Sequence, residues 1–189
     1  FGGGEFPPFE CGTFGIEIVV DSMKEIISSF VILILGGILQ GSLFSRIHIL
    51  NGTGDVIMVM LIVWSLNPYT RYSWIWLLLG ALIMTYLSAL PLYGYFFIYG
   101  IIWLFIRFLK SRFWQMPIIL MIFVTITGSI ISAVISYFVL YINDISPNLK
   151  TTVTQIAVPS LVLNLIYCFP IYGLLNDFAN SVCYKEESS

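Results

Sequence analysis

Ionised residues are scarce in this chain of 189 residues. They make up 10% of the sequence, whereas an average soluble domain has roughly 25%, and hydrophobic residues make up 59%. A chain with so few polar groups cannot cover the surface of a water-exposed globule. The net charge of −2 also lacks the basic excess by which proteins bind nucleic acid. The composition therefore favours one membrane domain and argues against a nucleic-acid partner.

The side chains that catalyse reactions or bind metals are scarce as well. The only histidine is His48, and the three cysteines, Cys11, Cys168 and Cys183, form no C-x-x-C pair. A metal site needs several such ligands close together, and a disulfide framework needs a regular cysteine pattern. A Ser-His-Asp triad would depend on His48, and the chain has no nucleophile elbow, phosphate-binding loop or dinucleotide fingerprint. We therefore predict no catalytic activity, no metal and no cofactor.

The few charges that are present stand between long uncharged stretches, such as 72–106 and 113–143. A charged side chain at the middle of a bilayer costs roughly 3 kcal/mol or more, so this spacing is typical of a chain that crosses lipid repeatedly. The stretch 72–106 would form a helix of about 50 Å, which exceeds a hydrocarbon core of about 30 Å. Pro91 and Gly94 favour a turn within it, because proline lacks a helical donor and glycine permits a tight turn.

Dividing the chain at this turn predicts an all-α polytopic membrane protein with six transmembrane helices. Their expected ranges are 26–45, 53–67, 73–89, 92–108, 116–141 and 152–175. If both ends lie in the cytoplasm, every lysine and arginine except Arg46 and Lys150 is on the cytoplasmic side, as the positive-inside rule requires. We therefore expect a membrane domain over residues 23–178, surrounded by membrane lipids, and a cytoplasmic C-terminal tail over 179–189.

The first 22 residues differ from the rest of the chain. They hold glycine and proline clusters and four acids but no lysine or arginine, so they lack the basic start of a signal peptide. Met23 and Lys24, directly before an apolar run, resemble a start of translation. We expect residues 1–22 to be an upstream extension, an artificial addition or an adaptable tail.

Small residues recur at every fourth position in two of the predicted helices. In lipid, such a stripe lets another helix approach closely, and serine can add hydrogen bonds across the contact. Stripes of this kind pack helices within one bundle or dock the helix of a partner, and the sequence leaves both alternatives open. The candidate docking residues are Gly37, Gly41 and Ser45 in the first helix and Gly128, Ser132 and Ser136 in the fifth.

A few polar residues and prolines stand out within the apolar runs. Asp55 precedes an apolar run and is expected to be a helix N-cap, the alternative being a functional acid at the edge of the second helix. Asn164 lies in the middle of the last helix, where an amide facing lipid is costly, so it is expected to face protein as a structural clamp or as part of a ligand cavity. Pro159 and Pro170 are expected to bend that helix.

The order of these features resembles the rod shape-determining protein MreD family over residues 23–189. The family's usual Pro-Asp pair at the second helix reads Gly54-Asp55 here. The matching features are Asp55 before the second helix, the Ser88-x-x-Pro91-x-x-Gly94 turn, and the runs Val158-Pro159-Ser160, Leu163-Asn164-Leu165 and Pro170-x-Tyr172 before a charged tail.

This resemblance implies a small bacterial inner-membrane protein of the cell-elongation machinery, which links peptidoglycan synthesis to cell shape. It implies an architecture similar to that of the substrate-binding subunits of energy-coupling-factor transporters. The implied partners are MreC, the glycosyltransferase RodA, a class B penicillin-binding protein and MreB, and no catalytic residues are implied.

Two functional hypotheses follow from the sequence. The first is a membrane scaffold that docks partner helices, with the basic segment Arg107–Arg112 against anionic lipid or a cytoplasmic partner. The second is a small-solute binding subunit of a transporter, which would dock a coupling protein through the stripe that begins at Gly37. Its cavity would be lined by Asn164, Gln155, Asn51 and the tyrosines at 93–99.

Overall fold

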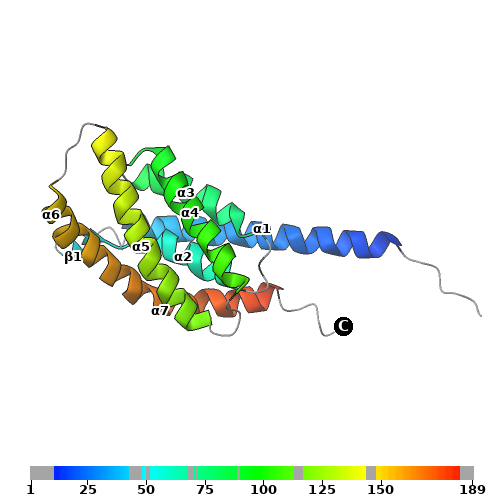
Figure 1. Cartoon of the computed structure of the whole chain (residues 1–189). Coiled ribbons are helices and arrows are strands. Elements are labelled where there is room, and N and C mark those ends of the chain that lie inside the picture. Colours follow the sequence, from blue (N-terminus) through cyan, green and yellow to red (C-terminus); the bar gives the residue numbers. More distant parts are fainter. Residues whose placement is uncertain are drawn as a thin grey trace, which may run out of the picture.

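The computed structural model of the chain is mostly helical (Figure 1). It describes residues 11–42, 48–49, 52–67, 70, 72–88, 90–112, 117–143 and 148–183. The elements in chain order are α1 (Cys11–Ser42), β1 (His48–Ile49), β2 (Gly52–Thr53), α2 (Val56–Leu66), α3 (Trp74–Leu87), α4 (Leu92–Lys110), α5 (Pro117–Ile142), α6 (Leu149–Thr151), the π-helix η2 (Thr152–Ala157) and α7 (Val158–Cys183). Each stretch predicted to be a transmembrane helix is helical over most of its length.

Only some of these helices have the length that a bilayer requires. Three stretches, Leu92–Lys110, Ile118–Ile142 and Leu149–Phe178, are long and apolar enough to cross a membrane. By contrast, α2 has 11 residues and α3 has 14, which gives about 17 and 21 Å at 1.5 Å per residue, against about 30 Å of hydrocarbon. Within the described residues the structure therefore has three candidate membrane spans, against the six transmembrane helices that the sequence predicted.

The break between α3 and α4 lies where the sequence predicted it. Ser88 has an extended backbone after the last turn of α3, and Pro91 is extended at the N-cap of α4. Proline is tolerated there because an N-cap residue donates no intrahelical hydrogen bond. The Gly94 N–H donates to the Pro91 carbonyl at 2.9 Å, and Gly94 is buried. Pro91 and Gly94 thus end one helix and begin the next within a few residues.

Both ends of the helical region extend further than expected. α1 begins at Cys11, so much of the stretch expected to be an extension or tail is helical, and residues 1–10 lie outside the described residues. The reason is local. The runs of consecutive glycines and prolines all lie before Cys11, and the two isolated glycines that follow, Gly12 and Gly15, each cost a helix only about 1 kcal/mol. Figure 1 shows α1 projecting well beyond the other helices. Likewise α7 ends at Cys183, past the expected start of the tail at 179.

The sequence did not predict the short antiparallel hairpin formed by β1 and β2. His48 pairs with Thr53, and Ile49 pairs with Gly52. The hairpin lies against η2 and the start of α7, at the buried Pro159. A proline ring within a helix clashes with the carbonyl four residues earlier, which for Pro159 lies in η2. This segment is a π-helix that ends just before α7, and its wider backbone relieves the clash.

Gly52 is expected to be sensitive to substitution because it touches the backbone of this helix. A Cβ at position 52 would lie 2.8 Å from the Ile156 carbonyl oxygen and 2.8 Å from the Ser160 nitrogen, neither of which can move away easily. We expect Gly52→Ala to lower the free energy of unfolding by about 2 kcal/mol. The matched control is Gly100→Ala, because a Cβ there meets nothing within 4 Å, and it should stay within about 1 kcal/mol of the parent. Unfolding in detergent measures both, and equal effects would contradict the expectation.

α2 is the centre of the bundle. All eleven of its residues are buried, and it contacts α1, α3, α4, α5 and α7. Near its C-terminal end Trp64 stacks on Trp76 of α3, with ring centroids 4.8 Å apart. The outer helices, by contrast, expose many large apolar side chains, such as Phe108 and Ile119. A buried helix of this kind has polar ends that only its neighbours can satisfy.

Candidate functional site at the ends of the buried helix

The N-terminal end of α2 is capped from three parts of the chain. Asp55 Oδ1 accepts from the Met58 N–H at 2.8 Å, which confirms the predicted N-cap. Gln40 of α1 accepts from the Val56 N–H at 2.9 Å and donates to the Gly54 carbonyl at 2.8 Å. Asn164 of α7 accepts from the Asp55 N–H at 2.7 Å. Side chains therefore replace the backbone partners that a helix end lacks.

Two further helices join this group through Asp55 and Asn164. The Tyr99 hydroxyl of α4 lies 2.9 Å from each carboxylate oxygen of Asp55. The Asn164 side-chain N–H donates to Ser129 Oγ of α5 at 3.0 Å. Asn164 is 3% exposed and has hydrogen bonds at both ends of its amide, so it faces protein, as expected, and its geometry is that of a structural clamp. Five helices are thus tied together at one point.

Sequence reasoning did not single out Gln40, Tyr99 and Ser129 as members of this group. Each was visible as a hydrogen-bonding side chain in an apolar run, yet nothing in the order of residues pairs Gln40 with Gly54 or Tyr99 with Asp55. Such pairs join residues far apart in the chain, so only the packing of the helices reveals them.

The C-terminal end of α2 is satisfied by a cation and a hydroxyl. Lys110 of α4 donates to the Ser65 carbonyl at 3.1 Å and to the Asn67 carbonyl at 2.6 Å. The Thr70 hydroxyl donates to the Trp64 carbonyl at 2.8 Å. The helix dipole is positive at its N-terminus and negative at its C-terminus, so Asp55 at one end and Lys110 at the other both stabilise α2.

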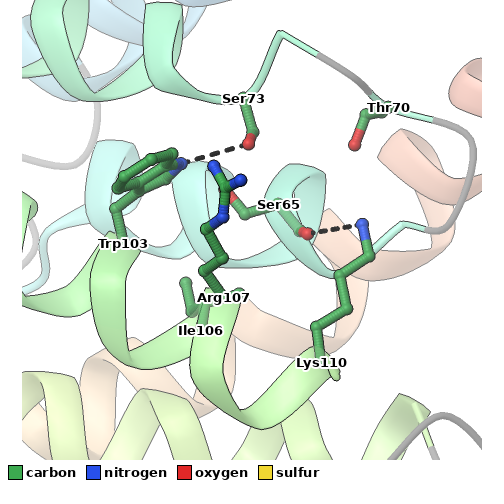
Figure 2. Close-up of a pocket in the computed structure, with 7 residues that line it drawn as sticks. All are labelled: Ser65, Thr70, Ser73, Trp103, Ile106, Arg107 and Lys110. Carbon is green, nitrogen blue, oxygen red and sulfur yellow. Dashed lines mark hydrogen bonds between the residues drawn. The ribbon is translucent and has the colours of Figure 1, made fainter.

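A pocket of about 220 Å³ opens beside this C-terminal end (Figure 2). The Trp103 N–H donates to Ser73 Oγ at 3.1 Å, and the Arg107 guanidinium lies 5.4 Å from the centre of the Trp103 ring. None of the lining residues is acidic, so the pocket carries two cations without a carboxylate among its walls. The lining residues are Ser65, Thr70, Ser73, Trp103, Ile106, Arg107 and Lys110.

The stripe on α1 that was a candidate for partner docking faces the chain's own α3. A Cβ on Gly37 would lie 2.8 Å from Ile83 of α3, and one on Gly41 would lie 3.1 Å from Leu87 at its end. Gly37 is buried in this contact, which corresponds to packing within one bundle, whereas Gly41 is exposed beside Leu87. Ser45, the third member of the stripe, lies outside the described residues.

The stripe on α5 also lies against the chain's own helices. A Cβ on Gly128 would lie 3.4 Å from Ile102 of α4 and 3.7 Å from Ile62 of α2. Ser132 and Ser136, which follow at the same spacing, are half-buried. Gly128 therefore serves packing around α2, and it leaves no free face for a partner helix at that position.

The structure does not bring together the residues expected to line a solute cavity. Asn164 and Tyr99 are buried and bonded around Asp55, whereas Gln155 is exposed. The side chain of Tyr93 is exposed and accepts a hydrogen bond from Asn143 at 2.8 Å, and Asn51 lies outside the described residues.

Pro170 and Tyr172 were also quoted for the family resemblance. Pro170 is exposed within α7, and Tyr172 is half-buried against the core. In the part of the chain that the structure describes, no three His, Cys, Asp or Glu side chains are close enough to hold a metal ion.

Comparison with protein-family models, curated proteins and solved structures gives no match for this chain. The relation to the MreD family therefore stays a resemblance carried by the residues quoted above.

Proposed function

We propose that this chain is a non-catalytic integral membrane scaffold of the bacterial cell-elongation machinery. The proposal places it in the inner membrane with both termini in the cytoplasm and gives it MreC, RodA, a class B penicillin-binding protein and MreB as partners. The family resemblance and the distribution of lysine and arginine support this assignment. In keeping with it, the polar groups buried at the ends of α2 are used for holding helices together.

The feature that carries the scaffold proposal is the outward face of α1. One side of this helix packs on the bundle through Leu33, Gly36, Gly37 and Gln40, whereas the opposite side is apolar and exposed. The described residues leave that side of α1 exposed, and the N-terminal part of α1 projects beyond the other helices (Figure 1). We take its occupant to be a transmembrane helix of a partner. We call this surface the exposed α1 face. Its residues are Met23, Ile26, Ile27, Phe30, Val31, Ile34, Leu35, Ile38 and Leu39.

Within this proposal the chain crosses the membrane six times, and the short α2 is part of the second crossing. Non-helical backbone is tolerated at membrane depth only where protein surrounds it. Here the residues just before α2 are bonded to Gln40 and Asn164, and the carbonyls at its end are bonded to Lys110 and Thr70. A helix of about 17 Å with such supported ends can complete a crossing without being long enough to span lipid alone.

The alternative, a small-solute binding subunit, has less support. Its expected cavity would need Asn164 and Gln155 on one accessible wall, whereas Asn164 is buried between Asp55 and Ser129 and Gln155 is exposed. Retention of a vitamin-like molecule through purification, detected by mass spectrometry, would favour this alternative over the scaffold.

The test of the scaffold proposal is to reduce the apolar surface of the exposed α1 face without adding polar groups. We expect the triple variant Ile27→Ala, Phe30→Ala and Ile34→Ala to reduce co-purification with MreC or RodA from native membranes by about tenfold or more, because apolar contact area at the partner helix is lost. The amount of each partner in the eluate, measured by quantitative mass spectrometry, gives the readout.

The matched control removes similar side chains from the exposed face of α5. The variant Ile119→Ala, Phe123→Ala and Ile130→Ala loses comparable apolar surface and should keep its partners within about twofold. Equal losses of co-purified partner in the two triple variants would show that the exposed α1 face contacts only lipid, which would contradict the proposal.

A further inference from the structure

The pocket beside the C-terminal end of α2 has polar groups that the fold does not use. Ser65 is 4% exposed, and its Oγ has no hydrogen-bond partner in the described part of the chain. A buried hydroxyl without a partner is costly, so most such groups in folded proteins meet a second polar group. Ser65 is one of the residues that line the pocket, so an acceptor bound there would lie close to this buried hydroxyl.

Two further donors are available in the same walls. Ser73 Oγ accepts from the Trp103 N–H, which leaves the Ser73 hydroxyl proton able to point into the pocket. Arg107 has five N–H donors in a planar fork, and its guanidinium lies over the face of Trp103. Lys110 adds positive charge to the wall while bonding the carbonyls at the end of α2.

The chemistry of these groups fits a phosphate. Several O–H and N–H donors and two cations, with no acidic residue in the walls, match an anion that has several acceptor oxygens. Ser73 is also the N-cap of α3, so the positive end of that helix dipole lies at the pocket. A volume of about 220 Å³ has room for a phosphate group and its immediate substituents.

The position of Arg107 on α4 points to a phosphate that belongs to a lipid. Trp103, Ile106 and Lys110 line the pocket on one side of Arg107, and the exposed Leu104 and Phe108 lie on its other side. At 100° per residue, Arg107 therefore stands at the border between a polar pocket and an apolar face. Leu104 is 60% exposed and Phe108 73% exposed, so that face suits an acyl chain.

We propose that this pocket, lined by Arg107, Ser65 and Ser73, binds the phosphate of an anionic phospholipid headgroup. The acyl chains would lie along Leu104 and Phe108 of α4, as in other basic pockets between transmembrane helices. A lipid site of this kind needs the chain to lie in a bilayer, but it does not depend on any partner helix. It can therefore fail while the scaffold proposal holds, and the reverse is also true.

The experiment is a titration of the purified full chain in mild detergent with phosphatidylglycerol, followed by native mass spectrometry. We expect Arg107→Gln to weaken phosphatidylglycerol binding about tenfold and Ser65→Ala about threefold. The matched control is Arg112→Gln, because Arg112 is an exposed arginine just past α4 and does not line the pocket. It should change binding by less than about twofold.

Several outcomes would overturn the lipid site. Equal weakening by Arg107→Gln and Arg112→Gln would indicate attraction to surface charge only. Protection against thermal unfolding by inorganic phosphate at the same concentrations as the lipid would assign the pocket to free phosphate. If Arg107→Gln fails to fold, Arg107→Lys replaces it, and binding by that variant that equals the parent's would show that the guanidinium fork has no role.

Discussion

Replacing Asp55 with alanine is expected to lower the free energy of unfolding by about 3 kcal/mol. The substitution removes the acceptor for the Met58 N–H, so the first turn of a fully buried helix loses its cap. It also leaves the buried Tyr99 hydroxyl without the carboxylate that lies 2.9 Å from it. Both groups lose their partner at a place that water cannot easily reach, which makes the loss larger than that of a surface cap. Unfolding in mixed micelles, followed by tryptophan fluorescence, measures the effect.

Two control variants separate the cap from the charge and from the tyrosine. Asp55→Asn keeps an N-cap oxygen and should retain more than half of the lost stability. Tyr99→Phe removes the hydroxyl alone, so combining it with Asp55→Ala should cost at least about 1 kcal/mol less than the sum of the single changes. If the two single effects simply add, the Asp55 and Tyr99 side chains are not coupled, and the assigned hydrogen bond is wrong.

Replacing Lys110 with methionine is expected to have an effect of similar size, about 3 kcal/mol, at the opposite end of α2. The ammonium donates to the carbonyls of Ser65 and Asn67, and methionine fills similar space without donating. The negative end of the helix dipole would then lose its cation as well as two hydrogen bonds. The same unfolding measurement applies, with the position of the transition compared at equal protein concentration.

The controls for Lys110 distinguish its charge from its hydrogen bonds. Lys110→Arg keeps both and should recover most of the stability, limited by the fit of the larger guanidinium. Thr70→Val removes the neutral donor to the Trp64 carbonyl at the same helix end and should cost about 1 kcal/mol. A Lys110→Met variant as stable as the parent would show that the carbonyls at this end find other partners, and the proposed support of α2 would be wrong.

The positions of the helices could be predicted because the signals for them are local. Long uncharged runs, the Pro91 and Gly94 turn and the acid before an apolar run each act on neighbouring residues, and α4 and α5 lie within about two residues of their predicted ranges. The start of α1 was harder to place, since the composition of the first 22 residues suggested a tail while single glycines do not stop a helix. Local rules thus place elements well and their ends less well.

The role of each polar residue could be predicted only where its partner is close in sequence. Asp55 as the N-cap of α2 involves Met58, three residues later, and was expected. The bond between Gln40 and Gly54 and the bond between Lys110 and Asn67 join α1 and α4 to the residues that flank α2, and no spacing rule connects them. For the same reason the stripe at Gly37 and Gly41 could be recognised, but the face that it meets could not.

The sequence by itself determined that this chain is apolar enough for a membrane, where its helices lie and where they break, because charge spacing, proline and glycine act locally. Only the tertiary structure decided which helix is central, because an eleven-residue helix is buried on every side only when its neighbours close around it. The tertiary structure also decided which buried polar groups have hydrogen-bond partners among the described residues and which do not. Asn164 is fully engaged, whereas Ser65 and Arg107 face a pocket. Burial and pairing depend on residues brought together from distant parts of the chain, and such distances are set by packing.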